Sequence, residues 1–173
     1  MPNSNVLKIA RVLNILVSIT FICNLLALLL VPTLVRQAYV SPYLYQELLW
    51  DQTLVWKDPQ AVALIFFLWF SGICTAVILW QGRRVLRTIL HGAPFSLENA
   101  ISLRRAAVSS FVISTAALAR LVFSICYYRS LAPLLSYNAL FVPIFAMAGL
   151  LCLVMSALFR QAAEMKAEND LTI

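Results

Sequence analysis

Four long apolar stretches, separated by short polar segments, dominate the chain. They fall at about residues 12–35, 61–80, 106–127 and 140–159, and three of the four contain no charged residue. Each is close to or above the roughly 20 residues that a helix needs to cross the hydrocarbon core of a bilayer. Runs of this length are too long for the strands of a membrane barrel. The pattern therefore predicts an all-α, polytopic membrane protein: four transmembrane helices in a bundle, forming a single domain over residues 1–173.

The polar segments between these spans differ in length and character. Residues 36–60 form the longest loop and mix tyrosine and tryptophan with acidic side chains. Such aromatic residues gather at the boundary between lipid and water, so residues 45–55 are expected to form a short helix lying on the outer membrane surface. Residues 81–105 form a cytoplasmic connector between the second and third spans. Residues 129–136 contain Pro133 and predict a tight hairpin on the outer side.

The connector contains the signals that end one helix and start the next. Gly92 tolerates the left-handed backbone of a helix C-terminus, and Pro94 disfavours a helical conformation in the residue before it. Ser96 is a favourable N-cap, and Glu98 in the first turn complements the helix dipole. The third helix is therefore expected to begin in the cytoplasm, well before the bilayer. Its extension has a polar face and an apolar face, which contain respectively Glu98, Ser102 and Arg105, and Leu97, Ile101 and Val108.

The fourth helix is expected to extend past its span in the same way. Arg160 and Glu164 are four residues apart, a spacing that supports a helix, so the helix is predicted to project into the cytoplasm beside the start of the third. Asn169 and Asp170 are expected to end it. In the first span, Pro32 lacks an amide donor and is expected to bend or end the helix.

Composition and charge agree with a membrane protein. Hydrophobic residues make up 62% of the chain and charged residues 12%, with a mean hydropathy of +0.89, whereas soluble domains contain about 25% charged residues. The net charge of +6 comes from cations next to the ends of the spans. Cations flanking one side of a membrane are what the positive-inside rule produces, so we expect no direct binding of nucleic acid.

The distribution of these cations predicts the topology, because cytoplasmic segments carry an excess of lysine and arginine. Three cations fall on one side of the four spans: Arg36, Lys57 and Arg129. Nine fall on the other side: Lys8, Arg11, Arg83, Arg84, Arg87, Arg104, Arg105, Arg160 and Lys166. The richer side is expected to be cytoplasmic, with both termini there.

Arg120 is the one charged residue within a predicted span. A charged side chain at the centre of a bilayer costs about 2.5–3.5 kcal/mol on the insertion scale, so Arg120 needs a partner or a route to water. It is close enough to the outer end of its span for the side chain to reach the interface. The alternative is a buried contact, either with Asn24 of the first span or with Glu47 or Asp51 of the outer loop, that ties this loop to the bundle.

The sequence contains no pattern typical of a catalytic or metal site. Cys23, Cys74, Cys126 and Cys152 all lie in apolar runs, and the only histidine, His91, lies in the connector. Buried cysteine usually behaves as a small apolar residue. We therefore expect no metal, no cofactor, no disulfide and no enzymatic activity.

Two motifs resemble a known bacterial family. The connector reads Gly92-Ala93-Pro94-Phe95-Ser96, followed by Asn99 and by Leu103-Arg104-Arg105, and the tail reads Phe159-Arg160-Gln161 and then Glu168-Asn169-Asp170-Leu171-Thr172-Ile173. Both are similar to the family called domain of unknown function 2975, and the resemblance runs from the first span to the last residue. It implies a four-helix protein of the bacterial inner membrane, and such proteins are frequently encoded beside a small helix-turn-helix regulator. It supplies no activity and no catalytic residues.

The polar ends of the third and fourth helices indicate where function lies. We expect an interaction, regulatory or sensor protein whose cytoplasmic face docks a protein, for example a small helix-turn-helix regulator. Beside the lipid bilayer itself, Arg83, Arg84 and Arg87 are candidates for binding an anionic lipid. The alternative is a small oligomeric transporter or channel that uses the polar residues within the spans, namely Asn14, Ser18, Asn24, Ser114, Thr115 and Arg120.

Overall fold

The computed structural model describes residues 4–39, 59–92 and 95–171, and these residues form helices almost throughout. The elements are α1 (Ser4–Tyr39), α4 (Pro59–Leu90), α5 (Leu97–Tyr128), the short 3-10 helix η2 (Ala132–Leu135) and α6 (Tyr137–Leu171). Each of the four long helices contains one of the predicted spans and is long and apolar enough to cross a membrane. The predicted all-α class with four transmembrane helices is confirmed.

Every long helix is longer than the span it contains. At about 1.5 Å per residue, the 32 residues of α5 reach about 48 Å, whereas the hydrocarbon core of a bilayer is about 30 Å thick. Both α5 and the 35-residue α6 are therefore long enough to extend beyond the hydrocarbon core, as the sequence predicts.

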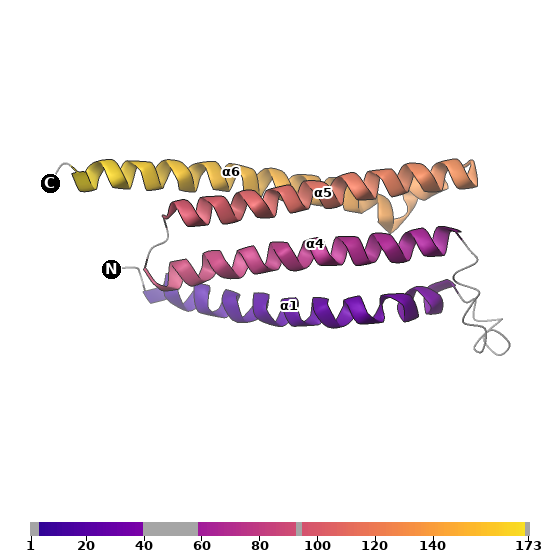
Figure 1. The fold of residues 1–173 in the computed structure, drawn as a ribbon, viewed down its shortest axis with the longest axis horizontal. Coiled ribbons are helices and arrows are strands. Elements are labelled where there is room, and N and C mark those ends of the chain that lie inside the picture. The colour runs from indigo at the N-terminus through magenta and orange to yellow at the C-terminus, as the bar shows by residue number, and fades with distance from the viewer. Residues whose placement is uncertain (1–3, 40–58, 93–94, 172–173) are drawn as a thin grey trace.

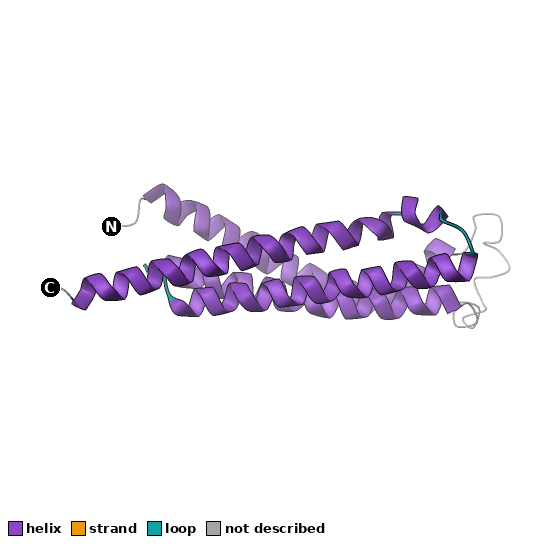
Figure 2. Ribbon diagram, turned by 90° about the horizontal axis from the view of Figure 1, so that it is seen from above, coloured by secondary structure: helices purple, strands orange, loops and turns teal. Residues whose placement is uncertain are grey.

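The helices lie in a row and alternate in direction (Figure 1). In the described residues α1 packs on α4, α4 on α5 and α5 on α6, and no other pair of long helices shares an extensive interface. We call the end with the start of α1, the turn between α4 and α5 and the end of α6 the connector end. The opposite end, which contains η2, is the hairpin end. Figure 2 shows that α1 crosses the other helices at an angle.

Small residues pack the central helix α5 against its two neighbours. Its buried positions are mostly alanine and serine: Asn99, Ala100, Ser102, Ala106, Ala107, Ser110, Ile113, Ser114, Ala117, Leu121 and Ser124. Small side chains let helix backbones approach closely, and such packing drives helix association in lipid, where apolar side chains gain little by leaving the hydrocarbon. Most of the large aliphatic residues in the middle of α5 face outward, as at Val112, Leu118 and Val122, and Ile113 and Leu121 are the buried exceptions.

Close packing also joins α1 to α4. Gly72 leaves room for Leu28, since a Cβ atom at this position would lie 2.5 Å from the Cδ2 atom of Leu28. The Asn24 Nδ2 donates a hydrogen bond of 3.0 Å to the Gly72 carbonyl. Nearer the hairpin end, a small buried cluster continues the interface and consists of Val31, Val35, Ala61 and Ile65.

Pro32 was expected to bend or end the helix, and it does not end it, because α1 continues to Tyr39. A proline removes the amide that would bond to the carbonyl four residues earlier, here that of Leu28. The Trp69 Nε1 of α4 donates a hydrogen bond of 2.9 Å to this carbonyl. The neighbouring helix thus replaces the lost donor, which lipid cannot supply.

Three further expectations concern the end of α6 and the segments between the spans. Asn169 and Asp170 do not stop α6, which runs through both residues to Leu171. The surface helix expected over residues 45–55 lies outside the described residues. The hairpin at residues 129–136 is present: Arg129 follows α5 with a left-handed backbone (φ 49°), and η2 comes next.

Candidate functional site

The connector turn is built as its sequence predicts. Gly92 has a positive φ of 81°, and its amide donates to the Ile89 carbonyl at 3.1 Å. Ser96 is extended (φ −126°, ψ 147°), and its Oγ accepts a hydrogen bond from the Asn99 amide. Pro94, the other residue expected to shape this turn, lies outside the described residues. The turn therefore returns the chain directly from α4 into α5.

An ion pair joins the two helices across this turn. The Arg84 Nε of α4 donates to the Glu98 Oε1 of α5 at 3.0 Å, and the Arg84 Nη2 contacts the same oxygen. About half of each side chain is exposed to solvent. Exposed pairs of this kind contribute about 0–1 kcal/mol, so the pair orients the connector more than it stabilises the fold.

The first turns of α5 are not divided into faces as expected. Ser102 was expected to share a polar face with Glu98 and Arg105, but it is buried (1% exposed) while both of the others are exposed. Asn99 is also buried. The small polar side chains turn inward because α5 packs through small residues. Leu97 and Ile101, in contrast, are 54% and 53% exposed.

A groove at the connector end lies between the start of α5 and the second half of α6. Its volume is about 580 Å³, and its lining consists of Leu97, Ala100, Ile101, Arg104, Leu153, Ser156, Ala157, Arg160 and Glu164. The Ser156 Oγ donates to the Ala100 carbonyl at 2.7 Å and fixes the two helices beside each other. The rings of Phe95 and Phe159 also meet across the helices, with centroids 5.8 Å apart. We call this hollow the α5–α6 groove.

The charges around the α5–α6 groove are mainly positive. Arg104 and Arg105 are exposed on α5, and neither forms an ion pair within the described part of the chain. On α6, the Arg160 Nε donates to the Glu164 Oε1 at 2.9 Å, as the four-residue spacing predicts. The tail residues Glu168 and Asn169 are exposed on the last turns of α6, and the side chain of Asp170 lies outside the described residues.

A second hollow at the connector end is smaller and basic. Its volume is about 210 Å³, and it is lined by Trp80, Arg83, Arg84 and Arg87 of α4. The guanidinium carbon of Arg83 lies 5.8 Å from the ring centroid of Phe21 on α1. The structure thus brings together the three arginines that the sequence marks as candidates for lipid binding.

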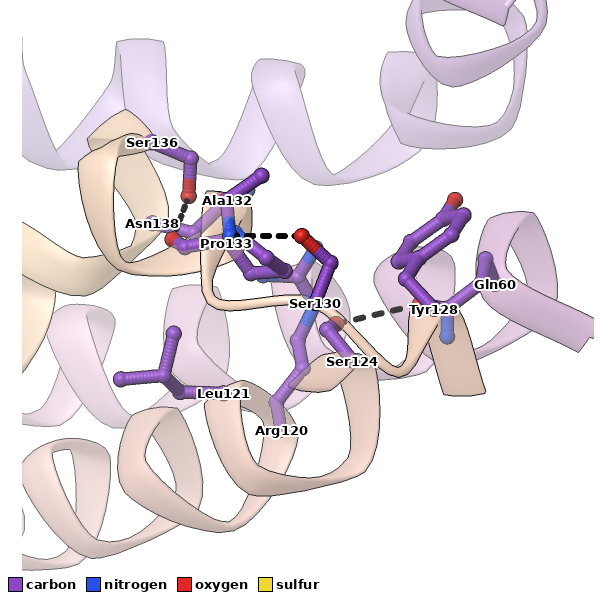
Figure 3. Close-up of a pocket in the computed structure, with 10 residues that line it drawn as sticks. All are labelled: Gln60, Arg120, Leu121, Ser124, Tyr128, Ser130, Ala132, Pro133, Ser136 and Asn138. Carbon is purple, nitrogen blue, oxygen red and sulfur yellow. Dashed lines mark hydrogen bonds between the residues drawn. The ribbon is translucent and has the colours of Figure 1, made fainter. Parts of the chain in front are cut away.

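The hairpin end contains a polar pocket of about 520 Å³ (Figure 3). The Ser124 Oγ of α5 donates to the Gln60 Oε1 of α4 at 3.1 Å, and both side chains are buried. Arg120 extends from α5 toward the turn that contains Ser130. The remaining lining consists of Leu121, Tyr128, Ala132, Pro133, Ser136 and Asn138.

Arg120 and Asn24 belong to different helix interfaces. The guanidinium carbon of Arg120 lies 5.3 Å from the ring centroid of Phe67 on α4, a distance at which a cation is attracted to an aromatic ring. Asn24 bonds to Gly72, as described above. Glu47 and Asp51, the acidic partners considered for Arg120, lie outside the described residues.

Hydroxyl groups within the spans bond to backbone carbonyls. The Ser18 Oγ donates to the Asn14 carbonyl and the Thr115 Oγ1 to the Phe111 carbonyl, each at 2.7 Å. The Ser114 Oγ donates across to the Val142 carbonyl of α6 at 2.9 Å. Three of the polar side chains considered for a transport path are thus engaged with helix backbones.

The residues expected to be chemically inert are spread over the helices. The four cysteines are free thiols on four different helices. His91 is exposed, and its Nδ1 lies 2.7 Å from the Arg87 carbonyl. In the described part of the chain, no group of three histidine, cysteine or acidic side chains is close enough to hold a metal ion.

Sequence reasoning missed one side of the α5–α6 groove and the contact between Gln60 and Ser124. Leu153, Ser156 and Ala157 lie within the apolar run of the fourth span, where nothing distinguishes them from lipid-facing neighbours. The signal that was available is the series of small residues along α5, which marks the helix that others pack against.

A comparison with known protein families confirms the resemblance that the two motifs indicated. A family model described as a protein of unknown function, DUF2975, matches residues 50–173. The match includes α4, α5 and α6 together with the connector and the tail, but it begins after α1, later than the resemblance suggested. No curated protein and no solved structure matches the chain.

Proposed function

The chain belongs to the DUF2975 family, and we propose that it is a membrane-embedded, non-enzymatic interaction protein that docks a soluble protein at its connector end. We place it in the inner membrane of a bacterium, with the connector end in the cytoplasm. The proposal is supported by the exposure of apolar and basic side chains at the connector end, namely Leu97, Ile101, Arg104 and Arg105.

The orientation rests on charge. Cytoplasmic loops carry an excess of lysine and arginine. Because the helices alternate in direction, nine of the chain's cations belong to the segments at the connector end, from Lys8 at the start of α1 to Lys166 near the end of α6. The start of α1 and the end of α6 lie at the same end of the row (Figure 1), as an even number of crossings requires.

One observation carries the docking proposal: on its α5 side the α5–α6 groove exposes apolar side chains that precede the third span, although its α6 side begins within the fourth span at Leu153. Leu97 lies nine residues before Ala106, where the third span begins, which is about 13 Å along a helix. Leu97 and Ile101 are nevertheless more than half exposed. Contiguous apolar surface in contact with water marks a site of interaction.

Charge and shape indicate which partner fits. The floor of the α5–α6 groove is apolar, and Arg104 and Arg105 project beside it without an ion pair in the described residues. An amphipathic helix that places apolar residues in the groove and acidic residues against the arginines matches both features. Such a helix on a small cytoplasmic regulator is the occupant we propose.

The end of α6 provides a second side for this partner. Figure 1 shows α6 continuing past the start of α5, and Met165 on this extension is 58% exposed. Methionine adapts its shape to different apolar partners. A helix lying in the groove would therefore also contact the projecting tail.

Site-specific photocrosslinking in living cells tests this proposal. A photoreactive phenylalanine at position 101 is expected to form an adduct with one soluble protein that carries an acidic amphipathic helix. The same group at position 122 is the matched control, because Val122 is on the same helix and equally exposed, at 52% against 53% for Ile101. A chain ending at Phe159 should lose the adduct.

Binding of the purified partner completes the test. The captured protein should bind the full chain in lipid nanodiscs, and R104E/R105E should weaken its binding by reversing the complementary charge. Equal adducts from positions 101 and 122, or binding that ignores the charge reversal, would contradict the proposal. A transporter receives less support, because several of its candidate polar groups bond to helix backbones.

A further inference from the structure

The basic hollow on α4 brings three arginines to one face of the helix, and the docking proposal does not involve them. Trp80, Arg83, Arg84 and Arg87 are spaced three, four and seven residues apart, so they share one face of the helix. These four residues line the hollow, and no acidic side chain is among them. Three guanidinium groups therefore converge on one space of about 210 Å³.

Helix α1 contacts two of the residues that line this hollow through the ring of Phe21. The ring of Phe21 lies 6.0 Å from that of Trp80 and 5.8 Å from the guanidinium carbon of Arg83, measured to ring centroids. The Nε of Arg83 is shielded from solvent and has no hydrogen-bond partner among the described residues. Because this Nε is shielded, an anion that enters the hollow would bind Arg83 through its other guanidinium nitrogens.

The position of the hollow indicates where the acceptor comes from. Trp80 is the last residue of the uncharged run over residues 61–80, and tryptophan in this position lies at the level of the lipid headgroups. Arg83 and Arg87 follow within the next two turns. Phosphate is the acceptor present at this level, and arginine binds its oxygens through paired hydrogen bonds.

Arg84 has a competing partner within the chain. It lines the hollow, but its guanidinium group contacts Glu98 on α5. An anion in the hollow and the Glu98 carboxylate would draw on the same guanidinium group. Binding in the hollow is therefore coupled to the ion pair that joins α4 to α5 across the connector.

We propose that the hollow binds the headgroup phosphate of an anionic phospholipid, held by Arg83 and Arg87, and that Glu98 competes with this phosphate for Arg84. The site is separate from the α5–α6 groove and does not depend on a docked protein. When Arg84 binds the lipid phosphate, it releases Glu98, and the ion pair that joins α4 to α5 across the connector is broken.

Native mass spectrometry of the full chain tests the site. The protein is released from nanodiscs that contain equal amounts of phosphatidylglycerol and phosphatidylcholine, and the retained lipids are counted. The wild-type chain should retain phosphatidylglycerol preferentially. R83Q/R87Q should lose this preference by about tenfold or more, since the loss of one hydrogen bond to a charged group corresponds to about tenfold or more in binding.

The control removes the same charge elsewhere at the same end. R104Q/R105Q should keep the preference within about twofold of wild type, because neither arginine lines the hollow. E98Q should strengthen the retention of phosphatidylglycerol, because Arg84 is released. R87Q alone changes an exposed side chain and provides a second test if the double variant does not fold.

Three results would overturn the inference. Equal losses in R83Q/R87Q and R104Q/R105Q would mean that general surface charge retains the lipid. Unchanged retention in E98Q would remove the competition with Glu98. Displacement of phosphatidylglycerol by inorganic phosphate in wild type but not in R83Q/R87Q would assign the hollow to a soluble anion instead of a lipid.

Discussion

At the connector end of α5 the charged side chains point into solvent, whereas toward its hairpin end Arg120 and Ser124 lie against α4. Arg104 and Arg105 are exposed beside the α5–α6 groove. Arg120 packs over a ring of α4, and Ser124 bonds to the buried Gln60. Both ends also expose apolar surface, including Leu131 and Leu135 at the hairpin end. The difference lies in the polar groups, because Arg104 and Arg105 are accessible whereas Arg120 and Ser124 are engaged with α4.

The difference has a physical origin in what surrounds each end. Polar groups at membrane depth must be satisfied within the protein, and α4 provides the contacts of Arg120 and Ser124 toward the hairpin end. Beyond the hydrocarbon, water satisfies an arginine at little cost, so a cation can remain free for a partner. A polar residue near a helix end therefore stabilises the fold where its side chain contacts another helix, as at Ser124. Where its side chain faces water, as at Arg104, it is available to a partner.

The largest effect on stability is expected at the hairpin end. Ser124→Leu removes the hydrogen bond to Gln60 and forces a large side chain into a closely packed position, which should cost about 2–3 kcal/mol of the free energy of unfolding. Val122→Leu is the control, because Val122 is about half exposed and its change should cost less than about 0.5 kcal/mol. Denaturant unfolding of the purified protein in mixed micelles measures both, and similar losses would remove the contrast between inward and outward positions.

A smaller effect is expected where α4 compensates for Pro32. Trp69→Phe removes the indole donor from the Leu28 carbonyl and should cost about 1 kcal/mol, in the range of hydrogen bonds between membrane helices. In a Pro32→Ala background the amide of residue 32 can bond to that carbonyl itself, so Trp69→Phe should cost less. A double-mutant cycle of unfolding free energies tests this, and purely additive costs would show that Trp69 does not replace the missing donor.

The ion pair at the connector should contribute still less. Glu98→Gln removes the contact with Arg84 and should lower the free energy of unfolding by at most about 0.5 kcal/mol. The difference from wild type should shrink as salt is added, because both side chains are exposed to screening ions. Unfolding at low and high ionic strength measures this, and a loss above about 2 kcal/mol independent of salt would place the pair in the core instead.

The smallest effect on stability and a large effect on binding are expected at Ile101. Ile101→Ser replaces a side chain that is more than half exposed, so the free energy of unfolding should change by less than about 0.5 kcal/mol. The neighbouring Ser102→Leu alters a buried position and should cost about 1–3 kcal/mol. If Ile101→Ser lowered stability as much as Ser102→Leu, the α5–α6 groove would be part of the core and not a binding surface.

Local signals in the sequence predicted much of this architecture. The four spans, the N-cap at Ser96, the left-handed Gly92 and the pairing of Arg160 with Glu164 all depend on residues a few positions apart. Such features follow from helix length, capping and side-chain spacing, which a single sequence contains.

Contacts between distant segments could not be predicted in the same way. Helix α1 continues past Pro32 because Trp69, 41 residues from the Leu28 carbonyl, supplies a donor. The burial of Ser102 and the groove lining from Leu153 and Ser156 depend on how α5 and α6 are rotated against each other. A sequence pattern predicts that a segment is helical, but which face of the helix is buried depends on the helices that pack against it.

The most direct test of the account is the side of the membrane that each end of α5 faces. With the four native cysteines replaced, single cysteines at positions 98 and 130 are exposed to a membrane-impermeant maleimide in spheroplasts. The account predicts that position 130 is labelled in intact spheroplasts and that position 98 is labelled only after the membrane is opened. Labelling of position 98 in intact spheroplasts, with position 130 protected, would place the α5–α6 groove outside the cytoplasm and contradict the docking proposal.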